Sequence, residues 1–202
     1  AQHGFTVITD EVYEDFIYGG ARHRSLAALE PAYRERTILV NSFSKTYAMT
    51  GWRLGYNAAP AAIMAAMTKM NAVAGRAAAA FTQQAGIAAL QGEEGDVAGM
   101  AREYEARRAL MLERLATIPG LRYNVPDGAF YVFVDCSAWG LPSRELADRV
   151  LDLGRVVVTP GDYYGPAGRG CLRLSFASSE EAIRSGMDGF AEALAVLRKV
   201  GA

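Results

Sequence analysis

A lysine that follows two hydroxyl side chains is the feature of this sequence that could best do chemistry. Lys45 lies in the segment 41–55, just beyond an apolar run. Its neighbours are two serines, an arginine eight residues further on and two glycines: Ser42, Ser44, Arg53, Gly51 and Gly55. Hydroxyls, a guanidinium and glycines that allow close approach suit a phosphate group. A partly desolvated lysine near other cations has a lowered pKa and can form a Schiff base. A lone lysine here would be a solvated surface residue, but the combination predicts a pyridoxal phosphate site.

A carboxylate and a phenol follow an earlier apolar run. Asp10 and Tyr13 belong to the tetrapeptide Asp-Glu-Val-Tyr at residues 10–13. Pyridoxal phosphate acts as an electron sink when a carboxylate keeps its ring nitrogen protonated. Taken alone, Asp10 would begin a turn and Tyr13 would pack in the core. Together with the lysine segment, we interpret Asp10 as the partner of the ring nitrogen and Tyr13 as a donor to the phenolic oxygen.

A third charged residue interrupts the apolar run 171–176. Arg173 would be costly there without a partner, and arginine suits planar, bidentate binding of a carboxylate. The alternative is a structural salt bridge with an acidic residue. The glycine-rich segment 161–170 lacks the G-x-G-x-x-G pattern of a dinucleotide site, and we expect a mobile loop near Arg173. The segment 128–131 (Gly-Ala-Phe-Tyr) could place a ring near a substrate, although aromatic core packing is the simpler interpretation.

Several elements must position these residues. Apolar and β-branched runs predict a buried parallel strand at 5–9 and two further strands at 37–40 and 54–58. Polar residues at the strand ends favour an α/β sheet with its ligand beyond the carboxyl edge. Further strands are expected at 121–124, 129–135, 155–159 and 171–176. Helices are expected at 25–36 (broken by Pro31), 60–71, 77–90, 93–117 and 143–153, capped by Ser143, with a last helix capped by Ser178 or Ser179.

Composition excludes several classes of protein. The chain has 202 residues, 51% hydrophobic, with 21 basic and 22 acidic residues and a net charge of −1. Such a chain is not a disordered segment, and it lacks the basic surface of a nucleic-acid binder or of an electrostatic membrane anchor. The most apolar stretch, 72–90, is interrupted by polar residues and makes a poor membrane span. The two cysteines, without CxxC spacing, indicate buried free thiols in a reducing compartment, and we expect no metal site. His3 and His23 stand isolated in the sequence.

The order of the motifs resembles that of the class I/II aminotransferases, which are fold-type I pyridoxal-phosphate enzymes. The motifs are DEVY, SFSK, GWRLGY, GAFY and CLRLSFA, at 10–13, 42–45, 51–56, 128–131 and 171–177. The resemblance covers nearly the whole chain but only the second half of that fold. It implies an α/β fold: the C-terminal part of a PLP-transferase-like large domain, with a mixed, mostly parallel sheet, and a small α+β domain. The expected boundaries are 1–92 for the large-domain part, 93–118 for a connecting helix and 119–202 for the small domain.

The resemblance also implies a role for each motif residue. Lys45 would form the Schiff base with the cofactor and move a proton between the substrate Cα and the cofactor. Asp10 would pair with the pyridinium and Tyr13 with the phenolic oxygen, while Arg173 would bind the substrate α-carboxylate. The phosphate would be bound by Ser42, Ser44 and Arg53.

The function expected from this resemblance is transamination between an amino acid and a 2-oxo acid, in a cytoplasmic homodimer that binds neither nucleic acid nor membrane. Two alternatives remain: another fold-type I enzyme (β-lyase, decarboxylase or synthase), or the aminotransferase-like effector module of a transcription regulator. The family's first half supplies a glycine-rich loop, a stacking ring and an asparagine that have no match here. We interpret the abrupt start as a truncation and expect these 202 residues alone to bind cofactor weakly or not at all and to be inactive.

Overall fold

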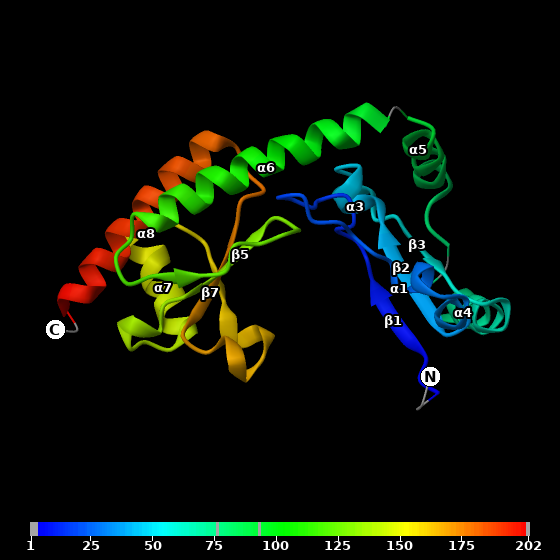
Figure 1. Ribbon diagram of the computed structural model, residues 1–202, viewed down its shortest axis with the longest axis horizontal. Coiled ribbons are helices and arrows are strands. Elements are labelled where there is room, and N and C mark those ends of the chain that lie inside the picture. The colour runs from blue at the N-terminus through cyan, green and yellow to red at the C-terminus, as the bar shows by residue number, and fades with distance from the viewer. Residues whose placement is uncertain (1–3, 76, 93, 201–202) are drawn as a thin grey trace. The chain divides into compact units, whose positions relative to one another are not determined.

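The structure is a computed structural model that describes residues 4–75, 77–92 and 94–200. The chain divides into two compact units, Ala1–Ala101 and Arg102–Ala202. The boundary between them falls inside the long helix α6 (Glu94–Ala116), the green helix of Figure 1. Each unit is described by itself below. No helix among the described residues is both long and apolar enough to cross a membrane.

Unit 1 contains a three-stranded mixed sheet. Strand β2 pairs with β1 in parallel and with β3 in antiparallel orientation, in the order β1-β2-β3. The strands are β1 (Val7–Asp10), β2 (Thr37–Ser42) and β3 (Gly55–Ala58). The helices are α1 (Leu26–Leu29), α2 (Pro31–Arg34), α3 (Phe43–Thr46), α4 (Ala61–Ala74) and α5 (Ala80–Leu90). Pro31 stands at the first turn of α2, which explains the break between α1 and α2.

The first strand is less buried than its sequence predicts. Phe5 and Ile8 are 70% and 69% exposed, and the pattern along β1 is almost entirely exposed. The expectation of a buried strand is therefore wrong for this chain. The physical reason is the position of β1 at the edge of the sheet, because the described residues pair it only with β2 and leave its apolar side chains uncovered.

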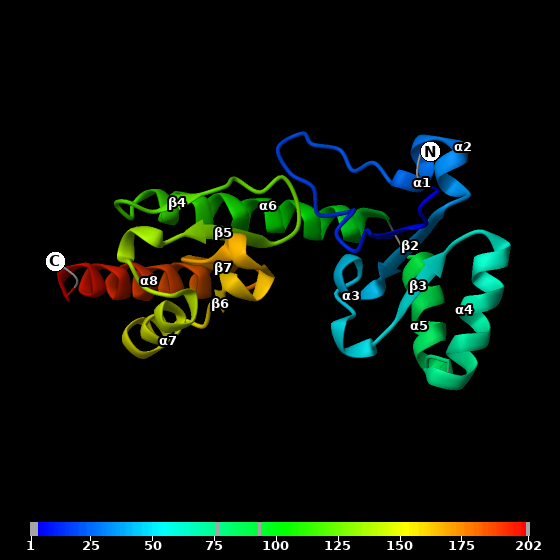
Figure 2. The same cartoon turned by 90° about the horizontal axis from the view of Figure 1, so that it is seen from below.

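Unit 2 contains a four-stranded antiparallel sheet with the order β4-β5-β7-β6. The strands are β4 (Arg122–Tyr123), β5 (Tyr131–Asp135), β6 (Thr159–Pro160) and β7 (Cys171–Ser175), and the helices that follow the sheet strands are α7 (Ser143–Gly154) and α8 (Glu180–Val200) (Figures 1 and 2). Alternate residues of β5 and β7, such as Val132 and Leu172, are fully buried. Two helical glycines meet where α7 packs against α8: a Cβ on Gly154 or on Gly189 would collide with the backbone of the other.

Two local predictions for unit 2 are wrong. Ser143 does not cap α7, because Pro142 occupies the cap position and Ser143 begins the helix. Its hydroxyl instead accepts from Gly170 N at 2.9 Å and donates to Gly168 O at 3.2 Å. The strand expected at 155–159 is confined to β6, because Arg155 ends α7 in the left-handed conformation. Ser179 does cap the last helix, since its hydroxyl accepts from Ala182 N at 3.2 Å.

Candidate active site

Lys45 lies on the short helix α3, directly after β2, and Ser42 sets the start of that helix. The Ser42 hydroxyl accepts a hydrogen bond from Ser44 N at 3.0 Å and donates one to Leu54 O at 3.2 Å. Ser42 is thus the N-cap of α3, a position that serine favours because its oxygen satisfies an orphan amide. The hydrogen bonds of Ser42 therefore fix the turn that carries Lys45 at the carboxyl end of β2.

Two buried side chains of this turn, Phe43 and Thr46, hold it in place. Phe43 is buried, and its ring lies 5.4 Å from that of Tyr47 and 5.9 Å from that of Tyr56. Thr46 is also buried and donates a hydrogen bond to Asp15 at 2.7 Å. Lys45 itself is half-buried. Because its neighbours on both sides are fixed, the backbone of Lys45 has little freedom.

Asp10 and Tyr13 come from the adjacent strand end. Asp10 is the last residue of β1, opposite Val40 of β2, and its carboxylate accepts from Val12 N at 3.3 Å. The turn that follows brings Tyr13 back toward α3, so that Lys45 Nζ lies 6.0 Å from the centre of the Tyr13 ring. The parallel pairing of the two strands therefore places these residues at one edge of the sheet, as the sequence predicts.

Arg53 lies in the loop that leads into β3 and adopts the left-handed conformation, with φ of 54°. Its guanidinium donates to Thr50 O at 3.2 Å, and the Thr50 hydroxyl donates to Ser44 O at 3.0 Å. Within the part of the chain that the structure describes, Arg53 forms no ion pair and the Ser44 hydroxyl makes no hydrogen bond. An uncompensated guanidinium and an available hydroxyl are the donors that a phosphate group requires.

The two glycines of this loop differ from each other. A Cβ on Gly55 would lie 2.8 Å from Asn41 O, whereas one on Gly51 would meet nothing within 4 Å. Gly55 is thus tightly packed, but against the chain itself and not against an open site. Since its contact is the carbonyl of Asn41 on the paired strand, Gly55 serves the β2–β3 pairing.

Sequence reasoning missed a set of polar contacts that joins the two strand ends. The buried Asn41 donates to the Glu14 carboxylate, and its amide oxygen accepts from Ser42 N at 2.7 Å. Burial, followed by the negative charges of Asp15 and Glu14, raises the pKa of Tyr47 above its ordinary value. The partners lie far apart in the sequence, and the only local signal was the run of acidic residues after Asp10.

His23 is not isolated as its sequence context suggested. Its ring lies 2.8 Å from the carboxylate of the buried Glu11, which also accepts from Ser25 at 3.0 Å and from Thr9 at 3.1 Å. Burial opposes the ionisation of Glu11, but these hydrogen bonds outweigh it and hold the pKa of the carboxyl below its ordinary value. Potential ligand atoms of Glu11, Glu14 and His23 lie within 4.8 Å of one another. The hydrogen bonds of Glu11 account for this grouping as a structural contact.

Arg173 lies at the middle of β7 in unit 2, between Phe133 of β5 and Thr159 of β6. The structural salt bridge that the sequence left open is not formed, since among the described residues Arg173 makes no ion pair. Its guanidinium instead lies over two aromatic rings, 4.1 Å from the centre of Tyr131 and 5.0 Å from that of Tyr164. Of the two aromatic residues of segment 128–131, Phe130 packs in the core as expected, whereas Tyr131 is half-buried and faces this arginine.

The glycine-rich segment beside Arg173 contains two short turns whose glycines pack against each other. Its residues form two 3-10 turns, Gly161–Tyr164 and Pro166–Gly168. A Cβ on either Gly161 or Gly168 would collide with the backbone of the other, so only glycine fits this approach. Proximity to Arg173, expected from the sequence, is confirmed through Tyr164.

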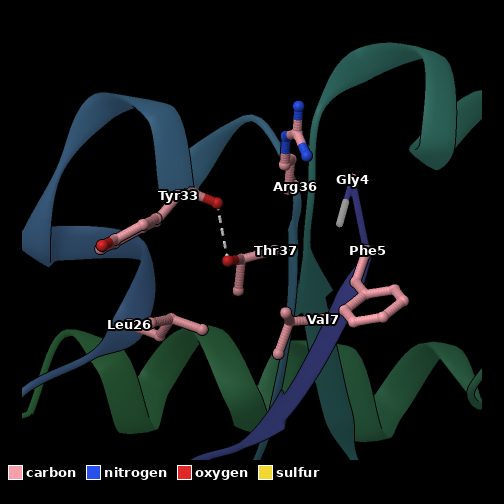
Figure 3. Close-up of a pocket in the computed structure, with 7 residues that line it drawn as sticks. All are labelled: Gly4, Phe5, Val7, Leu26, Tyr33, Arg36 and Thr37. Carbon is pink, nitrogen blue, oxygen red and sulfur yellow. Dashed lines mark hydrogen bonds between the residues drawn. The ribbon is translucent and has the colours of Figure 1, made fainter. Parts of the chain in front are cut away.

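A small pocket of about 190 Å³ lies at the opposite end of the sheet of unit 1. It is lined mostly by apolar side chains around the starts of β1 and β2, including Phe5, Val7 and Leu26, and Thr37 donates a hydrogen bond to Tyr33 O there (Figure 3). None of the predicted site residues lines it. The pocket is therefore separate from the candidate active site.

The fold and the residues at the carboxyl edge of the sheet define a class of protein, and comparison with known proteins identifies it. A family model for aminotransferases of class I and II matches residues 1–190, and the chain belongs to this family. It is 43% identical over 190 residues to an aspartate aminotransferase of Pyrococcus horikoshii, covering 93% of this chain and 48% of that protein. It is 41% identical over 189 residues to aromatic-amino-acid aminotransferase 2 of Thermococcus litoralis, with the same coverage, 93% and 48%.

A solved structure agrees with the sequence relatives. The aromatic aminotransferase of Pyrococcus horikoshii OT3 superposes with a TM-score of 0.91 at 42% identity, covering 98% of this chain and 52% of that one. The predicted fold class is thereby confirmed. The chain spans about half the length of the curated relatives that it matches.

Proposed function

We propose that this chain is the part of a pyridoxal-phosphate-dependent aminotransferase that carries the cofactor-attaching lysine, Lys45. The enzyme would move an amino group between an amino acid and a 2-oxo acid. The observation that carries the proposal is the placement of Lys45 on a capped turn at the end of β2, with Asp10 and Tyr13 supplied by the parallel strand β1. With this assignment, residues 1–92 would be part of the large domain, residues 93–118 the connecting helix and residues 119–202 the small domain.

The donor set fits the cofactor. Arg53 and the Ser44 hydroxyl would bind the phosphate group, because they offer a cation without an ion pair among the described residues and a hydroxyl without a partner there. The Ser42 hydroxyl would join them only by giving up its bond to Leu54 O. Asp10 would pair with the ring nitrogen and Tyr13 with the phenolic oxygen. When bound, pyridoxal phosphate supplies an electron sink for the electrons of the substrate Cα–H bond.

The remaining work falls to two side chains of this chain. Lys45 would take the proton from the substrate Cα and later return a proton to complete the transfer. Arg173 would bind the α-carboxylate of the substrate through its fork of N–H donors, which suits a planar carboxylate. The named relatives use different amino acids, aspartate in one case and aromatic residues in another, so the side-chain specificity of this protein stays open.

Comparing Lys45→Ala with Lys69→Ala tests the proposal. In the complete enzyme, we expect the absorbance change that added cofactor produces to be absent in Lys45→Ala and to persist in Lys69→Ala, since Lys69 is an exposed residue of α4. Unchanged absorbance in Lys45→Ala would overturn the assignment. Because the chain spans about half the length of its relatives, we expect these 202 residues alone to bind cofactor weakly at most and to turn over no substrate. Turnover by the purified chain would contradict this.

The reaction type and the setting are also proposals. In the complete enzyme, an amino acid and 2-oxoglutarate would yield glutamate in step with the new 2-oxo acid, whereas a β-lyase, a decarboxylase or a synthase would not form glutamate stoichiometrically. Specific DNA binding by the complete protein would favour the regulator alternative. We further propose a homodimer in the cytoplasm; the location is supported by the two free cysteines, Cys136 and Cys171.

A further inference from the structure

Arg173 is half-buried, lies against two aromatic rings and forms no ion pair among the described residues. Its neighbours along β7, Leu172 and Leu174, point into the core and are 0% and 4% exposed, so that Arg173 faces the other side of the sheet. The guanidinium carbon lies 4.1 Å from the centre of the Tyr131 ring and 5.0 Å from that of Tyr164. A cation over the face of a tyrosine is attracted by the ring quadrupole.

Each of these two rings is supported by another ring. Tyr131 lies 4.8 Å from Phe130, which is 8% exposed and so belongs to the core of unit 2. Tyr164 lies edge-on to Phe133, with the ring centres 6.0 Å apart. We call the pair Tyr131 and Tyr164 the tyrosine bracket. Phe130 supports the first ring and Phe133 supports the second.

The backbone fixes the second half of the bracket as well. Tyr164 ends the 3-10 turn Gly161–Tyr164, and the mutual approach of Gly161 and Gly168 closes this segment on itself. Ser143, the first residue of α7, bonds both Gly168 O and Gly170 N. The glycine-rich segment thus places a ring over Arg173 with little freedom to move away.

A neutral bracket has a chemical consequence that an acidic partner would not have. An aspartate or glutamate would occupy the N–H fork of Arg173 and would compete with any incoming carboxylate. Ring faces stabilise the positive charge without taking up its in-plane donors. We propose that Tyr131 and Tyr164 are positioning residues that hold the Arg173 guanidinium flat and available for the carboxylate of the substrate. That this carboxylate belongs to an amino acid or a 2-oxo acid rests on the proposed function.

The test measures anion binding at Arg173 directly in the 202-residue chain. The Nε–Hε signal of Arg173 is followed by NMR while 2-oxoglutarate is added, and the dissociation constant is read from its shift. We expect Tyr131→Leu and Tyr164→Leu each to raise this constant about 3- to 10-fold. Tyr131→Phe should keep the parent value, because the ring face remains and only the hydroxyl is lost.

Tyr163 provides a matched control on the same turn. It is 63% exposed, and Tyr163→Leu should leave the constant unchanged. Tyr164 is itself 53% exposed, so Tyr164→Leu tests the bracket without opening the core. The proposal is overturned by an unchanged constant in both leucine variants, by a loss in Tyr131→Phe as large as in Tyr131→Leu, or by an Arg173 signal that does not respond to 2-oxoglutarate.

This experiment is independent of the cofactor. Failure of cofactor attachment at Lys45 in the complete enzyme, with a normal response of Arg173, would refute the proposed function and leave the bracket standing. Attachment at Lys45 with no effect of the tyrosine variants would refute the bracket alone.

Discussion

Ser42→Ala should destabilise unit 1 even without cofactor, because the Ser42 hydroxyl fixes the turn that carries Lys45. The substitution removes the hydrogen bond from Ser44 N at 3.0 Å and the one to Leu54 O at 3.2 Å. Loss of a serine N-cap costs about 0.5–2 kcal/mol. Leu54 O keeps a second donor, Phe43 N at 3.2 Å, so loss of the other bond adds at most about 0.5 kcal/mol. We therefore expect a loss of about 0.5–2.5 kcal/mol in the free energy of unfolding.

The two tryptophans of the chain allow this loss to be assigned to unit 1, since Trp52 lies in unit 1 and Trp139 in unit 2. In a Trp139→Phe background, urea unfolding followed by fluorescence reports on unit 1. Ser44→Ala is the matched control, because the described residues give its hydroxyl no hydrogen-bond partner and its loss should cost nothing measurable. Equal stability of the Ser42→Ala variant and its parent, or an equal loss in Ser44→Ala, would refute the capping argument.

Three further predictions concern packing, pH and thiol reactivity. Gly189→Ala should lower the urea stability of unit 2 by about 1–3 kcal/mol through its collision with α7, whereas Gly186→Ala, with open space on the same helix, should raise it by about 0.5–1 kcal/mol; the reverse order would refute the packing argument. Because the pKa of Glu11 is lower in the folded protein, the ionised carboxylate stabilises the fold fully above pH 4.5, and this stabilisation is lost as the pH falls through the folded pKa. The free energy of unfolding of Glu11→Gln should therefore fall less below pH 4.5 than that of the parent. Identical curves of stability against pH would contradict this. Burial raises the pKa of Cys136 to about 12, so at neutral pH a thiol reagent should modify the half-buried Cys171 first; faster modification of Cys136 would contradict its burial.

Much of the fold follows from local sequence. Runs of β-branched residues that end in polar residues predicted β1 and β2, and their parallel pairing follows from the helical segment between them. The exposure of Ile8 did not follow, because burial of a strand depends on what covers it and not on its own composition. The true role of Ser143 was also hidden, since its partners, Gly168 and Gly170, lie 25 and 27 residues away.

The candidate site divides in the same way. Lys45 and its serines could be found because hydroxyls, lysine and arginine stand close together in one segment. The bonds that join the two strand ends could not, because Thr46 and Asp15 are 31 residues apart and meet only once the sheet forms. The contact between Tyr131 and Arg173 could not be predicted without the register of β5 and β7. Tyr131 is opposite Ser175, and its ring reaches Arg173 diagonally.

Reductive trapping of the cofactor tests the central claim most directly. The chain has three lysines, Lys45, Lys69 and Lys199, and borohydride in the presence of excess pyridoxal phosphate fixes even a weakly populated adduct to whichever lysine holds it. Peptide mass spectrometry should find Lys45 modified ahead of the exposed Lys69, and Arg53→Gln should reduce the modification of Lys45 alone. Equal or greater modification of Lys69 in the unaltered chain would contradict the assignment of Lys45 as the attachment site.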